Sequence, residues 1–423
     1  MNEKGKPENL SSEVSGAGAA SAATELHSLV RQPILNARHQ LVGYQLIFSR
    51  SNGDAEGDQE ASRVILDSIL LHGLEALTGG APAFLSCSAE FLAEPLVSAL
   101  SPESVVLEVS SRLEPLPETL EACQNLKAQG FRLVLSDYTW TSDPHPLLPL
   151  VQYVKVDFED LEQNEWARIL KSIEGTQAAL VADKINSRQS FQDAVAAGFS
   201  YFQGFYFCEP EPVHKTKISG NKLLHTELLR RLHEDPLDLK KIVPLVKRDT
   251  ALVFRLLKLV NSPVCAIRQE VSSVEMAILV LGESAFRRMA MLAILGEINA
   301  GQPEEVLHTA LTRARFCELA APTSNLDAEE QYLVGMLSLL PVMLQQSMAD
   351  VAAGLPLRAE ARSALLGEAV RERAQLAWVE AHEKNETSHS YAIADRFGLN
   401  IQKMEQFYVD AMMWESITAR SIR

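Results

Sequence analysis

The first half of the chain alternates, from Pro33 onward, between short apolar runs and segments with helical spacing. The apolar runs are nearly continuous, which is typical of strands buried on both faces of a parallel sheet. About seven such β–α units fit a closed, somewhat short (β/α) barrel. The predicted strands are 41–48, 83–87, 105–109, 131–135, 153–156, 178–182 and 201–207, and the predicted helices include 61–77, 116–129, 163–173 and 187–196.

The second half shows helical spacing alone. Pro210 and Pro212, followed by the polar stretch 214–221, mark a domain boundary. Beyond it the apolar positions recur every three or four residues, which predicts an all-α domain. Residues 272–275, SSVE, have the spacing of a capping box, and Pro263 ends the preceding helix. The predicted helices are 223–232, 239–246, 252–260, 274–281, 285–295, 306–319, 329–348 and 402–413.

The chain divides into four segments on this pattern. Residues 1–24 are rich in Ser, Gly, Ala and Glu and have almost no large apolar side chain, so we predict a flexible tail. A barrel domain follows at 25–212, a linker at 213–221 and a helical domain at 222–423.

Composition narrows the class of protein. The 423 residues are 47% hydrophobic and 22% charged, as in ordinary folded proteins. The net charge of −16 opposes binding to nucleic acid or to an anionic membrane. The N-terminus lacks the apolar region of a secretory signal, and the most apolar run, 334–344, is too short to span a bilayer. The five cysteines are widely spaced and form no CxxC pair. We therefore expect a cytoplasmic protein without nucleic-acid binding, membrane insertion or a cysteine-held metal.

Polar residues stand at the ends of the predicted strands, where barrel enzymes carry their chemistry. They are Glu108, Asp137, Lys155, Asp183 and Gln203. This series resembles the EAL family of cyclic di-GMP phosphodiesterases over about residues 30–212. The resemblance is carried, in order, by RQPILNARHQLVGYQLIF, VVLEVSS, LVLSDY, YVKVD, VADKIN and FQGFYFCEP.

The resemblance implies a site in which two divalent metals, held by carboxylates and an amide, activate water against a phosphodiester. Four positions depart from that pattern: Gln45, Ser86, Ser136 and Asn186 stand where the family has Glu, Asn, Asp and Glu. These changes remove anionic oxygen ligands, so we expect the affinity for divalent ions to fall. By the same resemblance, Asp183 is a shortened version of a family Glu.

The residues that still match the family allow three interpretations. Glu108, Asp137 and Lys155 form a structural ion-pair cluster at the barrel mouth, or they retain weak hydrolysis. In a third interpretation the barrel binds cyclic di-GMP without hydrolysing it. Ser49 replaces the family's phosphate-binding arginine, which weighs against binding, although Arg50 is adjacent. We favour the structural cluster.

The helical half has a resemblance of its own. DTAL at 249–252, LLKLVNSP at 256–263 and SVEMAILVLG at 273–282 are similar to the HDOD domain, a helical relative of the HD phosphohydrolases. In the parent superfamily a His-Asp pair binds metal. Ser338 and Leu339 stand in those two places here, so the resemblance implies that this metal site is lost.

Arginines in the helical half offer a candidate partner site. Arg287 and Arg288, with Arg313 and Arg315 nearby in sequence, form either a basic patch for a phosphate or an acidic partner, or a solvated helix face, which is the commoner case. The neighbouring helices are densely apolar, so we expect partner recognition in this domain.

The order EAL then HDOD resembles the YuxH-like family of two-domain bacterial signalling proteins. The sequence thus predicts a catalytically inactive regulator that needs no cofactor and contacts signalling proteins in a pathway related to cyclic di-GMP. The alternatives are a weak cyclic di-GMP phosphodiesterase and a non-hydrolysing cyclic di-GMP sensor.

Overall fold

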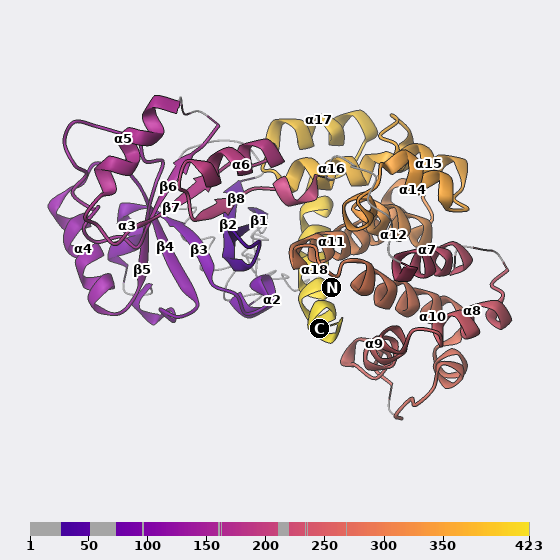
Figure 1. The fold of residues 1–423 in the computed structure, drawn as a ribbon. Helices are drawn as coiled ribbons and strands as arrows, with labels where there is room; N and C mark the ends of the chain where they lie inside the picture. The colour runs from indigo at the N-terminus through magenta and orange to yellow at the C-terminus, as the bar shows by residue number, and fades with distance from the viewer. Residues whose placement is uncertain are drawn as a thin grey trace, which may run out of the picture.

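The computed structural model describes residues 27–50, 73–159 apart from 95 and 96, 161, 163–209, and 220–422 apart from 233, 235 and 268. The predicted tail 1–24 and all but the last two residues of the predicted linker 213–221 lie outside the described residues. Figure 1 shows a strand-containing body built from the first half of the chain beside a body of helices built from the second.

The strands of the described residues form one closed barrel in chain order, β1 to β8. The first strand runs antiparallel to both of its neighbours, whereas all other neighbours are parallel. A cluster of apolar side chains, among them Ile34, Phe84 and Val106, fills the barrel. The strands are β1 (His27–Asn36), β2 (Leu41–Arg50), β3 (Ala83–Cys87), β4 (Val105–Ser110), β5 (Arg132–Ser136), β6 (Tyr153–Asp157), β7 (Ala179–Asp183) and β8 (Tyr201–Gln203).

Short helices connect the barrel strands and cover them. The chain before α6 supplies a capping box, in which the Ser187 hydroxyl accepts from the Ser190 N–H and the Ser190 hydroxyl accepts from the Ser187 N–H. The helices are α2 (Leu74–Thr78), α3 (Ala89–Ala93), α4 (Pro117–Ala128), α5 (Gln163–Ile173) and α6 (Arg188–Ala196), with the 3₁₀ turns η1 (Val97–Ala99) and η2 (Tyr206–Cys208).

The predicted barrel is correct in kind, and three details differ. The pattern missed β1, because Arg31, Gln32 and Pro33 interrupt its apolar run. The predicted strand 201–207 ends at Gln203, because Gly204 turns the chain at φ +135° and a Cβ there would lie 2.2 Å from the Ile185 carbonyl oxygen. Most of the predicted helix 61–77 lies outside the described residues.

The second half is helical throughout its described residues. Its helices are α7 (Gly220–Leu232), α8 (Leu239–Val246), α9 (Thr250–Val260), α10 (Val274–Ile298), α11 (Glu304–Ala320), α12 (Ala328–Leu337), α13 (Leu340–Leu344), α14 (Met348–Gly354), α15 (Ala359–Leu365), α16 (Ala374–Glu383), α17 (Thr387–Phe397) and α18 (Ile401–Ile422), with the 3₁₀ turns η3 (Pro263–Cys265), η4 (Ala321–Ser324) and η5 (Arg371–Arg373).

Several predicted helix boundaries change. The N-cap of α10 is Ser273, not Ser272, because the Ser273 hydroxyl accepts from the Met276 N–H. The predicted helix 329–348 is three helices, broken before Pro341 and again at Gln345, which has φ 57°. Three helices between 359 and 397 were missed. No helix in the described part of the chain has the length and apolarity needed to cross a membrane.

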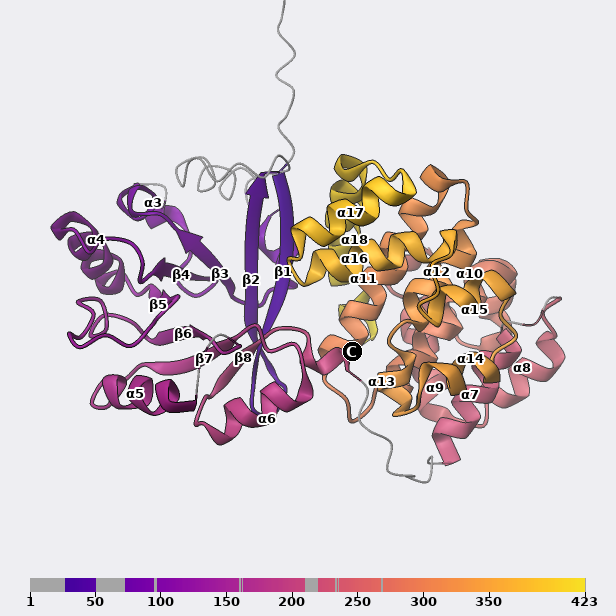
Figure 2. The same cartoon turned by 90° about the horizontal axis from the view of Figure 1, so that it is seen from above.

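Strand β1 joins the two bodies. It pairs with β8 only over Ile34–Asn36, so the edge of its first half has no neighbouring strand among the described residues. Helices α16 and α18 lie along this edge (Figure 2). The His382 ring nitrogen Nε2 lies 3.1 Å from the Leu29 carbonyl oxygen. The helical domain therefore provides a partner for a backbone carbonyl on this strand edge.

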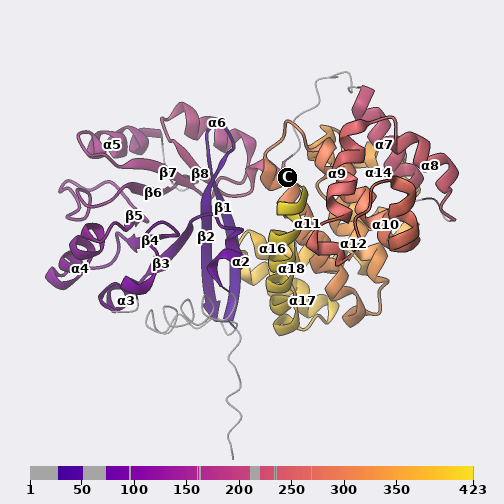
Figure 3. The same ribbon diagram turned by 90° about the horizontal axis from the view of Figure 1, so that it is seen from below.

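A buried charge cluster lies on the outer side of β1, where α18 passes beside the strand pair and α2 (Figure 3). Arg31 Nη2 lies 2.9 Å from Glu415 Oε2, and the two side chains are only 6% and 1% exposed. His308 Nδ1 lies 3.0 Å from the other oxygen of Glu415. Burial alone would raise the pKa of Glu415, but His308 and Arg31 outweigh it and lower that pKa to about 2. The cluster thus holds a charged carboxylate inside the interface.

We expect Arg31→Met to lower the free energy of unfolding by about 2–3 kcal/mol, because it removes one of the two cations that compensate the buried Glu415. Arg420→Met is the matched control, since Arg420 pairs with Glu75 at the surface, and it should cost less than about 1 kcal/mol. Urea denaturation of both variants measures the difference. Equal midpoints for the two variants would contradict the role assigned to Arg31.

The protonation of His382 should make the stability of the protein depend on pH. Burial lowers the pKa of this ring to about 4. The unfolded chain therefore binds a proton between pH 6.5 and 4 that the folded chain does not bind, so stability falls by about 3 kcal/mol as the pH is lowered through this window. His382→Gln places an amide donor near the Nε2 position and does not titrate. The stability of wild type should fall relative to that of the variant by this amount, and parallel pH–stability curves would refute the assignment.

Candidate functional site

The residues predicted for the barrel site lie at the carboxyl ends of the parallel strands. These ends meet at one rim of the barrel, which we call the barrel mouth. Neighbouring strands set the residues side by side: Ser86 pairs with Glu108 and Asp157 pairs with Asp183 in the register. Each predicted position follows from its strand: Gln45 lies on β2, Ser86 on β3, Glu108 on β4, Ser136 on β5 with Asp137 next to it, Lys155 on β6, Asp183 on β7 with Asn186 beyond it, and Gln203 on β8.

Lys155 is the centre of the barrel-mouth cluster, which comprises Gln45, Glu108, Lys155 and Asp183. Its Nζ lies 3.2 Å from Glu108 Oε1, 3.4 Å from Asp183 Oδ2 and 3.3 Å from Gln45 Oε1. The Lys155 and Glu108 side chains are only 8% and 7% exposed. Burial alone would lower the pKa of Lys155, but Asp183 and Glu108 outweigh it and raise that pKa. The ammonium is thus charged, and it lies between the carboxylates.

Neutral groups complete the strand ends beside this cluster. Gln45 Nε2 donates to the Ser86 hydroxyl over 3.1 Å, so both atoms of the Gln45 amide are engaged. Ser136 is buried at the end of β5. Within the described residues, no group of three or more His, Cys, Asp or Glu side chains is arranged to hold a metal ion.

The structure corrects the predicted membership of the cluster. Asp137 follows β5 with φ 50°, and its carboxylate accepts from the Ser110 hydroxyl over 2.8 Å and faces Arg112 at 3.7 Å. This left-handed turn directs Asp137 to the loop after β4. Asp183 occupies the place beside Lys155 that was expected for Asp137.

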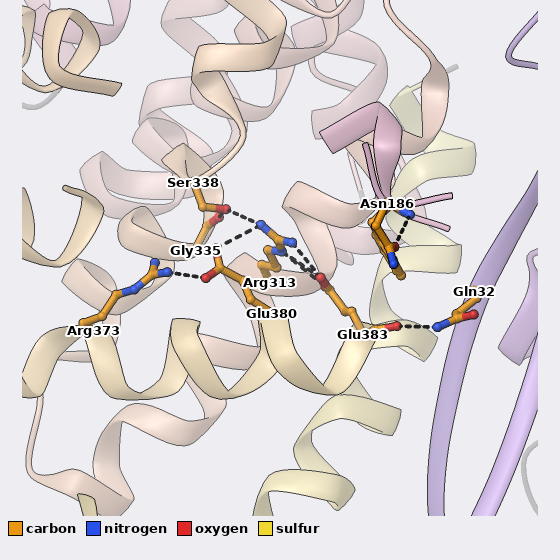
Figure 4. Close-up of polar contacts among 9 residues, drawn as sticks. Gln32, Asn186, Arg313, Gly335, Ser338, Arg373, Glu380 and Glu383 are labelled. Atoms are coloured by element: carbon orange, nitrogen blue, oxygen red, sulfur yellow. Dashed lines mark hydrogen bonds and ion pairs between the residues drawn. The ribbon is translucent and has the colours of Figure 1, made fainter. Parts of the chain in front are cut away.

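Gln203 and Asn186 hold the chain near the domain junction. Gln203 Nε2 donates to Gln32 Oε1 over 2.9 Å, and Gln32 Nε2 donates to the Glu383 carbonyl oxygen over 3.0 Å. Asn186 Oδ1 accepts from the Phe205 N–H over 3.4 Å, and Figure 4 shows Asn186 and Gln32 on the barrel side of α16. The last matched residue of the barrel motif is therefore linked to the helical domain through β1.

A second polar cluster surrounds Ser338, which by the resemblance stands in the place of the superfamily's His-Asp pair. We call it the Arg313 cluster; it comprises Arg313, Ser338, Glu380 and Glu383 (Figure 4). Arg313 Nη1 lies 3.4 Å from the Ser338 hydroxyl and 3.4 Å from Glu380 Oε1. Its Nε and Nη2 donate to Glu383 Oε2 over 3.0 and 2.7 Å, and Arg313 and Glu383 are only 5% and 2% exposed.

The close approach of α11 and α12 places this guanidinium beside Ser338. A Cβ on Gly335 would lie 2.4 Å from the Arg313 carbonyl oxygen, so only glycine fits at that crossing. Burial alone would lower the pKa of Arg313, but Glu383 and Glu380 raise it. Leu339, the other residue of the lost pair, is buried in the apolar core. A permanent cation thus lies at the Ser338 position.

Sequence reasoning singled out neither Glu380 nor Glu383, and it considered Arg313 only as part of a basic patch. A signal was present, because Arg313 lies among the buried apolar positions of α11, including Ala310 and Ala314. A charge within an apolar stripe requires a buried partner.

The four arginines of the expected basic patch are engaged by carboxylates of their own domain. Arg313 is buried, Arg315 and Arg288 each reach Glu318 at 2.7 Å, and Arg287 reaches Glu283 at 3.2 Å. Arg288 also lies over the Tyr332 ring. Their charges are therefore compensated locally, and partner contact by Arg287 and Arg288 stays a prediction.

Comparison with known families agrees with both halves of the chain. The EAL domain family matches residues 86–210, and the HDOD domain family matches residues 223–380. The chain therefore contains an EAL domain followed by an HDOD domain, as the sequence predicts.

Two relatives extend over most of the chain. Uncharacterized protein YuxH of Bacillus subtilis (strain 168) is 27% identical over 402 residues, covering 91% of this chain and 97% of the relative. Cyclic di-GMP phosphodiesterase CdgJ of Vibrio cholerae serotype O1 is 28% identical over 408 residues, covering 93% of each.

Solved EAL structures overlap with the barrel half. The PaMucR phosphodiesterase in complex with c-di-GMP is 16% identical, with a TM-score of 0.37, over 45% of this chain and 99% of its own. The FimX EAL domain from Pseudomonas aeruginosa bound to c-di-GMP is 18% identical, with a TM-score of 0.36, over 44% of this chain and 90% of its own.

We expect Lys155→Met to lower the free energy of unfolding by about 1–3 kcal/mol, because it leaves Glu108 buried without its cation. Lys184→Met is the matched control, since Lys184 pairs with Asp157 in a more exposed position, and it should cost less than about 1 kcal/mol. Denaturant midpoints measure both. An unchanged midpoint for Lys155→Met would show that the cluster contributes nothing to the fold.

Proposed function

We propose that this protein is a catalytically inactive signalling regulator that acts through protein contacts in a pathway related to cyclic di-GMP. The single observation that carries the proposal is the neutral Gln45 amide beside Glu108 and Asp183: it accepts from the Lys155 ammonium and donates to the Ser86 hydroxyl, where the family has a carboxylate. Gln45, Glu108 and Asp183 stand at positions that a phosphodiesterase of this family would need for metal.

Hydrolysis by two metals requires several anionic oxygens around ions about 3.5–4 Å apart. At this barrel mouth Gln45, Ser86, Ser136 and Asn186 carry no charge. The carboxylates of Glu108 and Asp183 already share one buried cation. A divalent ion in this place would be repelled by the ammonium or would have to displace it. The charge balance of the cluster therefore favours an inactive barrel.

The helical domain supports the same proposal. Arg313 places a fixed positive charge 3.4 Å from the Ser338 hydroxyl, at the place that the resemblance assigns to the metal-binding pair. Its bonds to Glu383 hold that carboxylate in the ion pair. In each domain a buried cation thus pairs with the carboxylate at the candidate site: Lys155 with Glu108 in the barrel, and Arg313 with Glu383 in the helical domain.

A weak phosphodiesterase is the second candidate. It is favoured by the relative CdgJ, which is named a cyclic di-GMP phosphodiesterase, and by the matching residues Glu108, Lys155 and Gln203. A non-hydrolysing cyclic di-GMP sensor is the third. The side chains of Ser49 and Arg50, on which its phosphate contact depends, lie outside the described part of the structure.

We expect purified full-length protein to hydrolyse no cyclic di-GMP above background with Mg²⁺ or Mn²⁺, because too few anionic ligands are left to hold two ions. Chromatography of the nucleotide products measures this. The Gln45→Glu/Ser136→Asp variant, which restores two of the lost carboxylates, tests for gain of activity in parallel. Turnover by the unaltered protein that disappears in Glu108→Ala would contradict the proposal and establish the second candidate.

A further inference from the structure

A groove opens on the helical domain and is lined by residues of that domain alone. Its volume is about 700 Å³, within the size range of binding pockets in proteins. It lies between α12, the second half of α10 and the segment that leads into α15. The α10 helix bends at Gly282, which has φ 75°, and the residues directly after this bend form one wall.

The groove has an apolar floor. Leu333 and Leu337 of α12 supply one side of it, and Pro356, Leu357 and Ala361 supply the other. Leu333 and Leu357 are partly accessible to solvent. Apolar side chains from a partner would therefore find partly exposed apolar surface to cover.

Carboxylates dominate the rim. Arg287 pairs with Glu283 at 3.2 Å, and Arg358 pairs with Glu330 at 3.6 Å, so the two arginines of the lining are already matched. The rim also carries Asp327 and Glu329.

These two carboxylates have only neutral partners. The Asp327 carboxylate caps α12 by accepting from the Glu330 N–H, and the Glu329 carboxylate accepts from the Ser284 hydroxyl. Among the described residues, neither has a cation within ion-pair distance. The rim therefore has an excess of negative charge.

The electrostatics of Glu330 agree with this excess. Burial raises the pKa of Glu330; Arg358 opposes the shift, while Asp327 and Glu360 add to it. A negative rim repels phosphates, nucleic acid and acidic peptides. In the sequence, Arg287 and Arg288 suggested a positively charged surface. The rim of this groove is negatively charged instead.

We propose that this groove docks a basic amphipathic helix of a partner protein, with its apolar side chains on the Leu333–Leu357 floor and its lysines or arginines against Asp327 and Glu329. An apolar face framed by cationic residues fits both features of the groove, and helix-in-groove docking uses this pattern. The inference names the partner chemistry of the regulator proposed above, and to that extent it rests on that proposal.

The experiment uses full-length protein and a fluorescein-labelled helical peptide of Leu and Lys, with Leu at three- and four-residue spacing. A peptide with Glu in place of every Lys is its control. Fluorescence anisotropy should show saturable binding of the Leu–Lys peptide, weakened by added salt, and no binding of the Leu–Glu peptide.

Two variants locate the site. Glu329→Lys should weaken binding about tenfold or more, because it replaces attraction at the rim by repulsion. Leu357→Ser should weaken it without changing net charge, because it removes apolar floor. Glu103→Lys makes the same charge change in an exposed loop of the barrel domain and should leave binding within about twofold. Thermal melts by circular dichroism confirm that each variant is folded.

Absence of Leu–Lys binding would overturn the inference, and so would equal weakening by Glu329→Lys and Glu103→Lys, which would reduce the effect to overall charge. The hydrolysis assay on the same protein separates the two proposals. If the protein neither hydrolyses cyclic di-GMP nor binds the peptide, only the proposal for the groove is wrong. If it hydrolyses cyclic di-GMP and binds the peptide, only the proposal of an inactive regulator is wrong.

Discussion

The unpaired edge of β1 is the constraint that organises this molecule. The strand belongs to the barrel, but β8 pairs only with its last three residues, Ile34–Asn36, and buried backbone groups without partners would be costly. His382 from the helical domain lies at hydrogen-bond distance from the Leu29 carbonyl oxygen of the uncovered part, and Arg31 on the same strand forms a buried ion pair with Glu415. The helices therefore cover the part of this strand edge that β8 leaves free, so the two domains share a buried interface.

Buried cations recur at each important position. Arg31 lies at the interface, Lys155 at the barrel mouth and Arg313 beside Ser338, and each has a carboxylate partner that is at least nine-tenths buried. Removing either member of such a pair leaves an uncompensated charge, so the pair fixes its surroundings. At the mouth and beside Ser338, the same pairs engage the carboxylates nearest to the places where the family resemblance expects metal. The same ion pairs therefore stabilise the fold and neutralise these carboxylates.

Local patterns in the sequence predicted what depends on local structure. Strands such as 83–87 and helices such as 163–173 appear at their predicted residues, because buried apolar runs and helical spacing are properties of neighbouring residues. Strand order then brought Glu108 and Lys155 together as expected. Local patterns could not show that Asp183, and not Asp137, lies beside Lys155. This depends on the left-handed turn at Asp137 after β5.

Contacts between distant segments left no local pattern. Arg31 and Glu415 are 384 residues apart in the chain, and β1 reads as an interrupted apolar run because its outer face carries this buried charge. The chain from Gln203 through Gln32 to Glu383 likewise joins three separate segments. The acidic groove depends on the bend at Gly282 and on helices that periodicity missed.

Metal binding at the barrel mouth distinguishes an inactive barrel from an active one. A titration of Mn²⁺ into the full-length protein with saturating cyclic di-GMP, followed by electron paramagnetic resonance of the free ion, tests it most directly. We predict that the free-ion signal rises as it does with nucleotide alone, because too few anionic ligands remain at the barrel mouth beside Glu108 and Asp183. One or two tightly bound Mn²⁺ ions per chain, lost in Glu108→Gln, would contradict it.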